Sequence, residues 1–302
     1  MITHSNAALN DIFQKVYTRG DIHPRYMLRL GYYGRQRQQD NDDYNLLEED
    51  FTKTGRVNYL LQRRIELLQE VQVLSESIGV SRTEERGKDG QSVYTCETAG
   101  YFYKHHVLTR IHAFEQNINK TNMLDIFPFT VYFQLHDQEL TEDQARDHFQ
   151  ILHALFQELA EYHPLELLPT HRQRIDYLLV HQARIIAMTC THSSIIRSRL
   201  LDIQFQYDTI IMEESAQMLD METFISFTMQ TKNRLKRIVL IGDPMQLPPI
   251  IKNRTLAEYC SFEQSFFRRM MRLGVPHIML DRQGRCRPDI AKLYRYVLFA
   301  FA

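Results

Sequence analysis

The stretch of sequence that decides the fold runs from residue 209 to residue 249. Its first part reads TIIMEESAQ at residues 209–217, and its last part reads IVLIGDPMQLPP at residues 238–249. In each part, a short apolar run of strand length ends in carboxylate or amide side chains. Open α/β sheets bind their ligands beyond the carboxyl ends of the parallel strands. The stretch is therefore typical of an NTPase core built on a parallel sheet.

Glu213 and Glu214 stand at the end of the first apolar run. In NTPases, one acid at this place acts on Mg²⁺ and the other acts on the attacking water. Two adjacent acids at a strand end are more often a solvated surface feature, so the pair alone decides little. The GDPMQLPP segment at residues 242–249 adds a glycine suited to a tight turn, the carboxylate of Asp243, the amide of Gln246 and a rigid Pro-Pro end. Such features suit a loop that senses a phosphate group.

These two segments resemble motifs II and III of superfamily 1 RNA helicases of the Upf1-like group. Three further segments extend the resemblance along the chain. THSN at residues 3–6 resembles motif Ia, AMTCT at residues 187–191 resembles motif Ic, and QGRCRPDI at residues 283–290 resembles the QYRMHP motif. The segments GRVNY at residues 55–59 and YTCETAGYF at residues 94–102 are similar to the spliceosomal, intron-binding branch of the group.

The resemblance implies that ATP and Mg²⁺ are the cofactors. Glu213 would hold Mg²⁺, Glu214 would orient the attacking water, and Arg285 would neutralise charge on the γ-phosphate. The matched residues that would act in catalysis are Glu214, Gln246 and Arg285. Those that would contact ATP are Asp243, Gln283 and again Arg285.

The resemblance also implies a nucleic-acid channel. Ser5, Asn6, Thr189 and Thr191 would face the backbone of single-stranded RNA, because hydroxyls and helix N-termini bind phosphate without reading sequence. An intron RNA and spliceosomal proteins would then be the partners, and the nucleus would be the location.

Two departures from the family pattern affect the site. Most of the wider group has Asp-Glu in motif II, whereas this chain has Glu213-Glu214, which adds a methylene at the metal residue. Mg²⁺ requires nearly ideal octahedral geometry, so the extra length is expected to slow turnover or to weaken metal binding. Gly284 replaces the usual aromatic residue and would loosen the packing beside Arg285.

The start of the chain is abrupt for an NTPase. Residues 1–4 read as the tail of a strand, and Ser5 is a candidate cap for the helix that follows. The 302 residues contain no G-x-x-x-x-G-K-[ST] phosphate-binding loop. We therefore expect an α/β fold with a RecA-like P-loop NTPase parallel sheet whose first strand and P-loop are missing, the loop being encoded upstream of Met1. The chain alone is then expected to be inactive.

Apolar residues recur every three or four positions over residues 56–78 and 103–118, and a third such pattern follows a Thr141-x-x-Gln144 capping box. Residues 20–55 read as an exposed loop. We expect three parts: residues 1–50 begin the RecA-like motor domain 1, residues 51–165 form a mostly helical insertion, and residues 166–302 complete the motor domain.

The last part alternates between strand and helix patterns, which implies a parallel sheet with right-handed crossovers. We expect strands at residues 184–189, 208–212, 236–241 and 277–280. Helices are expected at residues 170–182, 217–229, 262–273 and 288–298.

Composition is that of an ordinary globular sequence, with 44% hydrophobic and 24% charged residues. A net charge of −1 means that any nucleic-acid binding must come from a local basic face. The four cysteines are scattered without zinc spacing, which argues against zinc, and no apolar run approaches the ~20 residues of a membrane span.

A non-catalytic, helicase-like scaffold that binds RNA or spliceosomal proteins is the alternative to an ATP-dependent RNA helicase. Sequence alone leaves both open. An intact phosphate-binding loop upstream favours the motor, whereas a degenerate loop favours the scaffold.

Overall fold

The computed structural model describes residues 1–31, 50–80, 94–117, 123–135, 140–232, 234–280, 282, 284 and 286–299. The chain forms two compact units. The first, called the sheet unit here, comprises Met1–Lys53 and Leu179–Ala302. The second, called the helical unit, comprises Thr54–Leu178.

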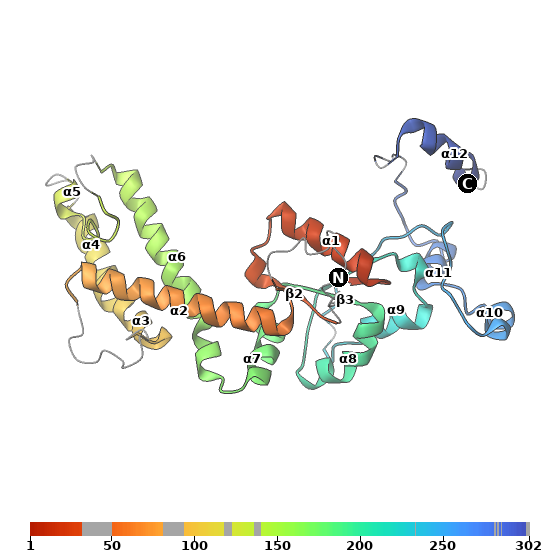
Figure 1. Ribbon diagram of the computed structural model, residues 1–302, viewed down its shortest axis with the longest axis horizontal. Helices are drawn as coiled ribbons and strands as arrows, with labels where there is room; N and C mark the ends of the chain where they lie inside the picture. Colours follow the sequence, from red (N-terminus) through yellow and green to blue (C-terminus); the bar gives the residue numbers. More distant parts are fainter. Residues whose placement is uncertain are drawn as a thin grey trace, which may run out of the picture. The chain divides into compact units, whose positions relative to one another are not determined.

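A parallel sheet organises the sheet unit. Within the described residues it has five strands in the order β2-β3-β1-β4-β5, and each neighbouring pair is parallel. The strands are β1 (Ile2–Thr3), β2 (Met27–Arg29), β3 (Ile185–Thr189), β4 (Thr209–Glu213) and β5 (Arg237–Leu240). Helix α1 lies on one side of this sheet, and α8 and α9 lie on the other (Figure 1). The expected parallel α/β sheet is thus confirmed.

Helix α1 (Asn6–Arg19) begins as the sequence predicts, because Ser5 accepts a hydrogen bond from the Ala8 N–H and caps it. Its buried face packs against the sheet and stabilises it through the removal of apolar surface from water. The buried residues of this cluster are Leu9, Phe13, Met27, Phe51 and Ala187.

The other helices of the sheet unit connect or follow the strands. The α-helices are α8 (Cys190–Asp202), α9 (Asp220–Phe227), α10 (Arg254–Cys260), α11 (Phe266–Arg272) and α12 (Pro288–Phe299). Short 3₁₀ turns occur at Pro24–Tyr26 and Ser215–Gln217.

In its described residues, the helical unit contains two long helices and several shorter ones. Its helices are α2 (Lys53–Ser77), which begins at the last residue of the sheet unit's first segment, α3 (Cys96–Phe102), α4 (Leu108–Asn117), α5 (Met123–Ile126), α6 (Glu142–Leu167) and α7 (His171–Tyr177). The predicted capping box is present at the start of α6, where Thr141 and Gln144 exchange hydrogen bonds. A π-helical turn at Tyr103–Val107 joins α3 to α4.

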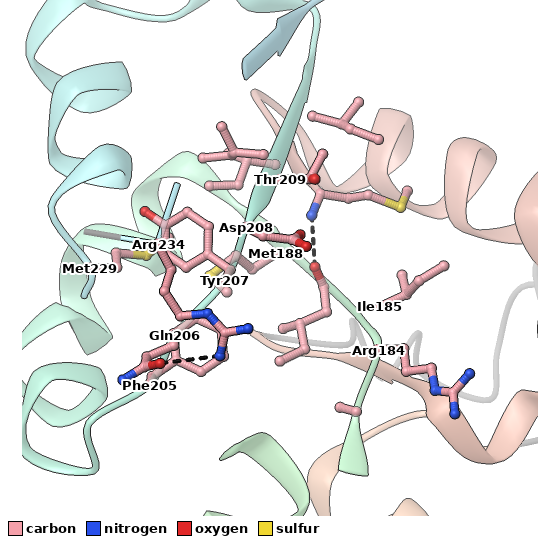
Figure 2. Close-up of a pocket in the computed structure, with 16 residues that line it drawn as sticks. Arg184, Ile185, Met188, Phe205, Gln206, Tyr207, Asp208, Thr209, Met229 and Arg234 are labelled. Atoms are coloured by element: carbon pink, nitrogen blue, oxygen red, sulfur yellow. Dashed lines mark hydrogen bonds between the residues drawn. The ribbon is translucent and has the colours of Figure 1, made fainter. Parts of the chain in front are cut away.

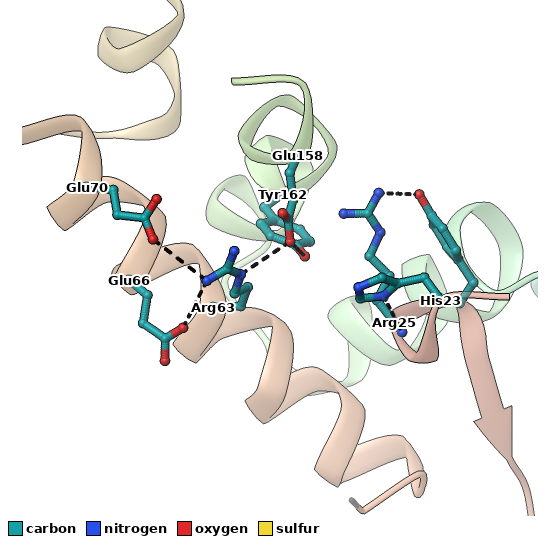
Figure 3. A network of polar contacts seen from close by, with 8 residues as sticks. His23, Arg25, Arg63, Glu66, Glu70, Glu158 and Tyr162 are labelled. Atoms are coloured by element: carbon teal, nitrogen blue, oxygen red, sulfur yellow. Dashed lines mark hydrogen bonds and ion pairs between the residues drawn. The ribbon is translucent and has the colours of Figure 1, made fainter. Parts of the chain in front are cut away.

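Arg63 connects the two longest helices of this unit. Its guanidinium contacts Glu66 at 3.4 Å and Glu70 at 3.9 Å on α2, and Glu158 at 3.4 Å on α6 (Figure 3). The Tyr162 hydroxyl donates to the same Glu158 carboxylate at 2.7 Å. Since several partners share one guanidinium, the group holds α2 and α6 together better than an isolated surface pair does.

Some element predictions were wrong. Residues 20–55 were expected to be loop, but Met27–Arg29 forms β2 with every residue buried. Residues 32–49 of that expected loop lie outside the described residues. Residues 277–280 form no strand, and Ile278 and Leu280 are 91% and 86% exposed, because no strand among the described residues pairs with them. The expected helix at 262–273 begins only at Phe266, and α8 was not predicted.

Candidate active site

The carboxyl ends of the central strands meet at one edge of the sheet. Thr3 at the end of β1 pairs with Glu213 at the end of β4 and with Thr189 at the end of β3. Met212 of β4 pairs with Leu240, the last residue of β5. The strand-end segments that carry most of the predicted site residues therefore lie side by side.

The acidic pair follows the end of β4. Burial raises the pKa of Glu213 above its usual value, the charges of Glu214 and Asp11 add to the rise, and Lys15 opposes it. Glu214 has φ 57° and ψ 32°, in the left-handed region that non-glycine residues rarely adopt. Backbone strain of this kind gathers at functional sites. The crowded negative charge makes this strand end a place that favours a cation.

The loop after β4 is tied to the loop after β5 through the main chain. Ser215 donates its backbone N–H and its hydroxyl to the Ile241 carbonyl oxygen at 2.9 Å and 2.8 Å. A Cβ atom on Gly242 would lie 2.9 Å from the Ala216 nitrogen, closer than real Cβ contacts allow. Only glycine therefore permits this approach of the two loops.

Asp243 and Gln246, the predicted phosphate sensors, bond to each other. The Gln246 side-chain amide donates to Asp243 Oδ2 at 3.1 Å, and the Met245 N–H donates to Asp243 Oδ1 at 2.9 Å. Gln246 is exposed and Asp243 is half-buried. The turn thus presents a preformed amide and carboxylate pair beside the acidic loop.

The predicted RNA-contacting residues fall into two pairs at the same edge. Ser5 caps α1, and Thr189 caps α8 by accepting from the His192 N–H at 3.2 Å. Helix N-termini attract phosphate groups. Thr191 is exposed in the first turn of α8.

Asn6 has a partner within the fold. Its side-chain carbonyl accepts from the Arg29 guanidinium at 2.9 Å, and Asn10 accepts from the same group at 3.0 Å. Arg29 is only 2% exposed, so Asn6 helps to satisfy a buried cation.

Gln283 and Arg285 lie outside the described residues, and their roles stay predictions. Sequence reasoning missed Asp11 and Lys15, whose charges act on Glu213 and which form a 2.7 Å ion pair one turn apart on α1. Their i, i+4 spacing on the helix after β1 was the available signal.

A cavity of about 540 Å³ opens at the opposite end of the strands. Its lining includes Arg184 and Ile185 before and at the start of β3, and Asp208 and Thr209 at the start of β4 (Figure 2). Arg234 donates to Gln206 at 3.2 Å on its rim. Because it lies at the amino ends of the strands, this cavity is separate from the acidic pair.

Within the described ranges, no three His, Cys, Asp or Glu side chains gather in a way that would hold a metal ion by themselves. The helices of the described part also include none that is long and apolar enough to cross a membrane.

An acidic pair and a polar turn at the carboxyl edge of a parallel sheet are typical of RecA-like NTPases. The AAA domain family model matches residues 1–254, and the chain belongs to this family. The chain is 39% identical to RNA helicase aquarius of Mus musculus over 98% of its own length and 20% of that relative. It is therefore an aquarius-like superfamily 1 helicase sequence.

More distant relatives are helicases too. The chain is 25% identical to 5'-3' DNA helicase ZGRF1 of Mus musculus over 60% of this chain and 9% of that protein. It is 30% identical to Helicase SEN1 of Saccharomyces cerevisiae over 37% of this chain and 5% of that protein. In each case, the chain spans only a small part of the relative's length.

Proposed function

We propose that this chain is the central part of motor domain 1 of an ATP-dependent RNA helicase that acts on introns in the spliceosome. The observation that carries the proposal is the joining of the Glu213-Glu214 loop to the Asp243 turn through Ser215 and Ile241. Residues 1–50 and 166–302 would form the RecA-like motor domain, and residues 51–165 its helical insertion.

The donor set fits Mg²⁺ bound with ATP. Oxygen atoms such as those of carboxylates are the ligands that Mg²⁺ takes, and Glu213 is a partly buried carboxylate whose pKa is raised by burial and then by the neighbouring charge of Glu214. Glu213 would hold the ion, with Asp243 contacting the nucleotide's phosphates. When bound, Mg²⁺ would neutralise the negative charge that builds up on the phosphate oxygens.

Glu214 would act on the water that attacks the γ-phosphorus. It would orient the water and accept its proton, while the water oxygen bonds to phosphorus and the bond to the ADP leaving oxygen breaks. Gln246, in the adjacent turn, would sense whether the γ-phosphate is present. Arg285 and Gln283 would complete the phosphate contacts, an assignment supported by their place in the QYRMHP-like segment.

The capped ends of α1 and α8 support an RNA path along this edge. Ser5, Asn6, Thr189 and Thr191 are short polar groups suited to phosphate and sugar oxygens. Binding would then depend on salt and only weakly on base sequence. Spliceosomal proteins as partners and a nuclear location are proposals that rest on the likeness to the aquarius relative.

The 302 residues alone would not hydrolyse ATP. Backbone amides and a lysine of the phosphate-binding loop hold the β- and γ-phosphates in NTPases, and the sequence has no G-x-x-x-x-G-K-[ST] segment. Phosphoryl transfer depends on positioning, so Glu214 would have no phosphate held in place to act on.

The test therefore uses a longer protein, called the extended protein here, in which a segment with a phosphate-binding loop precedes this chain. The added segment would come from the chain's own coding sequence or from the mouse relative. We expect Mg²⁺-dependent ATP hydrolysis that single-stranded RNA stimulates. RNA binding without any hydrolysis would instead identify the non-catalytic scaffold.

A further inference from the structure

A hydroxyl from the first helix reaches the predicted catalytic carboxylate. Ser5 Oγ lies 3.5 Å from Glu214 Oε2, although 209 positions separate the two residues along the chain. The sheet register creates this contact, because Thr3 of β1 pairs with Glu213 of β4. The loop after β1 is thereby brought beside the loop after β4.

The direction of this hydrogen bond follows from the partners of Ser5. Its Oγ already accepts from the Ala8 N–H at 3.2 Å as the cap of α1. The hydroxyl keeps its single proton to donate, and an ionised carboxylate can only accept. Ser5 is therefore the donor and Glu214 the acceptor.

Ser5 is also held firmly in place. Its carbonyl oxygen accepts from the Leu9 N–H at 3.1 Å and from the Thr3 hydroxyl at 2.7 Å, and Thr3 is fully buried. Glu214, by contrast, stands on a strained left-handed backbone with φ 57°. A rigid donor beside a carboxylate of this kind restricts the directions in which the carboxylate can point.

The distance is long for a hydroxyl and a carboxylate, which prefer about 2.7 Å. Hydrogen bonds of catalytic groups often tighten only when the substrate binds.

We propose that Ser5 is a positioning residue for Glu214, which its hydroxyl aims at the attacking water. This inference rests on the proposed function. It gives Ser5 a task in hydrolysis beyond the RNA contact expected from its motif, and it links the RNA-facing end of α1 directly to the nucleotide site.

The experiment measures ATP hydrolysis by the extended protein at saturating RNA, so that weaker RNA binding cannot account for a loss. Ser5→Ala is expected to lower kcat about tenfold with KM for ATP unchanged, since it removes a hydrogen bond to a charged group. Ser5→Thr keeps both the cap and the donor and is expected to restore most of kcat.

Two variants separate positioning from helix capping. Ser5→Asp keeps a capping oxygen but has no proton to donate, so we expect kcat to stay low. Ser265 caps α11 with the same 3.2 Å bond, to the Arg268 N–H, and Ser265→Ala is expected to leave kcat unchanged. Full activity of Ser5→Ala or Ser5→Asp would overturn the proposal.

A double-mutant cycle distinguishes failure of this inference from failure of the proposed function. In a Glu214→Gln background, Ser5→Ala is expected to cause no further loss, because the two residues act as a unit. An equal loss in both backgrounds would overturn the positioning role. If Glu214→Gln itself hydrolyses ATP like the wild type, the proposed function fails before Ser5 is tested.

Discussion

Ser215 and Ile241 form a double hydrogen bond in which one carbonyl oxygen accepts from a backbone N–H at 2.9 Å and from a hydroxyl at 2.8 Å. Ser215 is 1% exposed, so water does not compete for these bonds. Their effect is to fix the acidic loop against the turn that contains Asp243 and Gln246, at a main-chain acceptor that moves less than a long side chain does.

Gly242→Ala should disturb this junction. The added Cβ would lie 2.9 Å from the Ala216 nitrogen, which is backbone and has little freedom to retreat. We expect a loss of about 1–3 kcal/mol in the free energy of unfolding, the usual cost of overpacking. Urea denaturation of residues 1–302 measures it.

Gly100→Ala is the matched control, since Gly100 lies inside α3 and a Cβ there meets nothing within 4 Å. Alanine should stabilise this helix by about 0.5–1 kcal/mol. Equal effects of the two substitutions would show that Gly242 is not needed for the close approach.

Glu213→Gln should change how stability depends on pH. The pKa of Glu213 is raised in the folded state, mainly by burial and then by Glu214. The folded chain therefore binds more protons than the unfolded chain between the unfolded pKa, about 4.3, and the raised folded pKa. Wild-type stability is therefore lost as pH rises through this window. We expect Glu213→Gln to match the wild type near pH 4 and to exceed it at pH 7.

Thermal unfolding across this pH range checks the effect. Glu263→Gln, at an exposed position, should give a curve parallel to that of the wild type. A Glu213→Gln curve that also runs parallel would contradict the electrostatic account of this strand end.

Glu214→Asn should stabilise the fold while abolishing hydrolysis in the extended protein. Asparagine enters the left-handed region more readily than glutamate, and we expect a gain of about 1 kcal/mol in unfolding free energy. Gln204 also has a positive φ, 56°, away from the acidic pair, and Gln204→Asn should give a similar gain with hydrolysis retained. Destabilisation by Glu214→Asn alone would mean that its contacts outweigh the strain.

The cysteines should react with a maleimide at very different rates. Burial raises the pKa of Cys190 to about 11 and that of Cys96 to about 12, with Glu222 and Glu166 respectively adding to the rise. Thiolate is the reactive form, so both should label only after unfolding, whereas exposed Cys260 should label in the native state. Cys260→Ser should remove the fastest phase, and rapid native labelling of Cys190 would contradict its burial.

The sequence predicted the sheet best where local signals agreed. Apolar runs ending in polar residues located β3, β4 and β5, and a single hydroxyl located the start of α1. Short β2 was missed because three residues carry no readable period, and its burial depends on pairing with β3 far along the chain. The expected strand at 277–280 fails for the converse reason, since an apolar run needs a neighbouring strand to pair with.

For the candidate site, the sequence supplies residue types and motifs but not the contacts between the side chains. The motifs predict roles for Glu214 and Ser5, but only the register of β1 with β4 brings the two residues within 3.5 Å. The left-handed backbone of Glu214 and the charges of Asp11 and Lys15 near Glu213 likewise arise from tertiary packing.

The most direct test of the central claim compares wild type and Glu214→Gln in the extended protein, with ATP binding and RNA-stimulated hydrolysis measured on the same samples. Glutamine keeps the size of the side chain but cannot take the proton of the attacking water. We predict that ATP binding is nearly unchanged and that hydrolysis falls about 10²- to 10⁴-fold, the usual contribution of a general base. Hydrolysis at the wild-type rate would contradict the assignment of the acidic pair as the catalytic site.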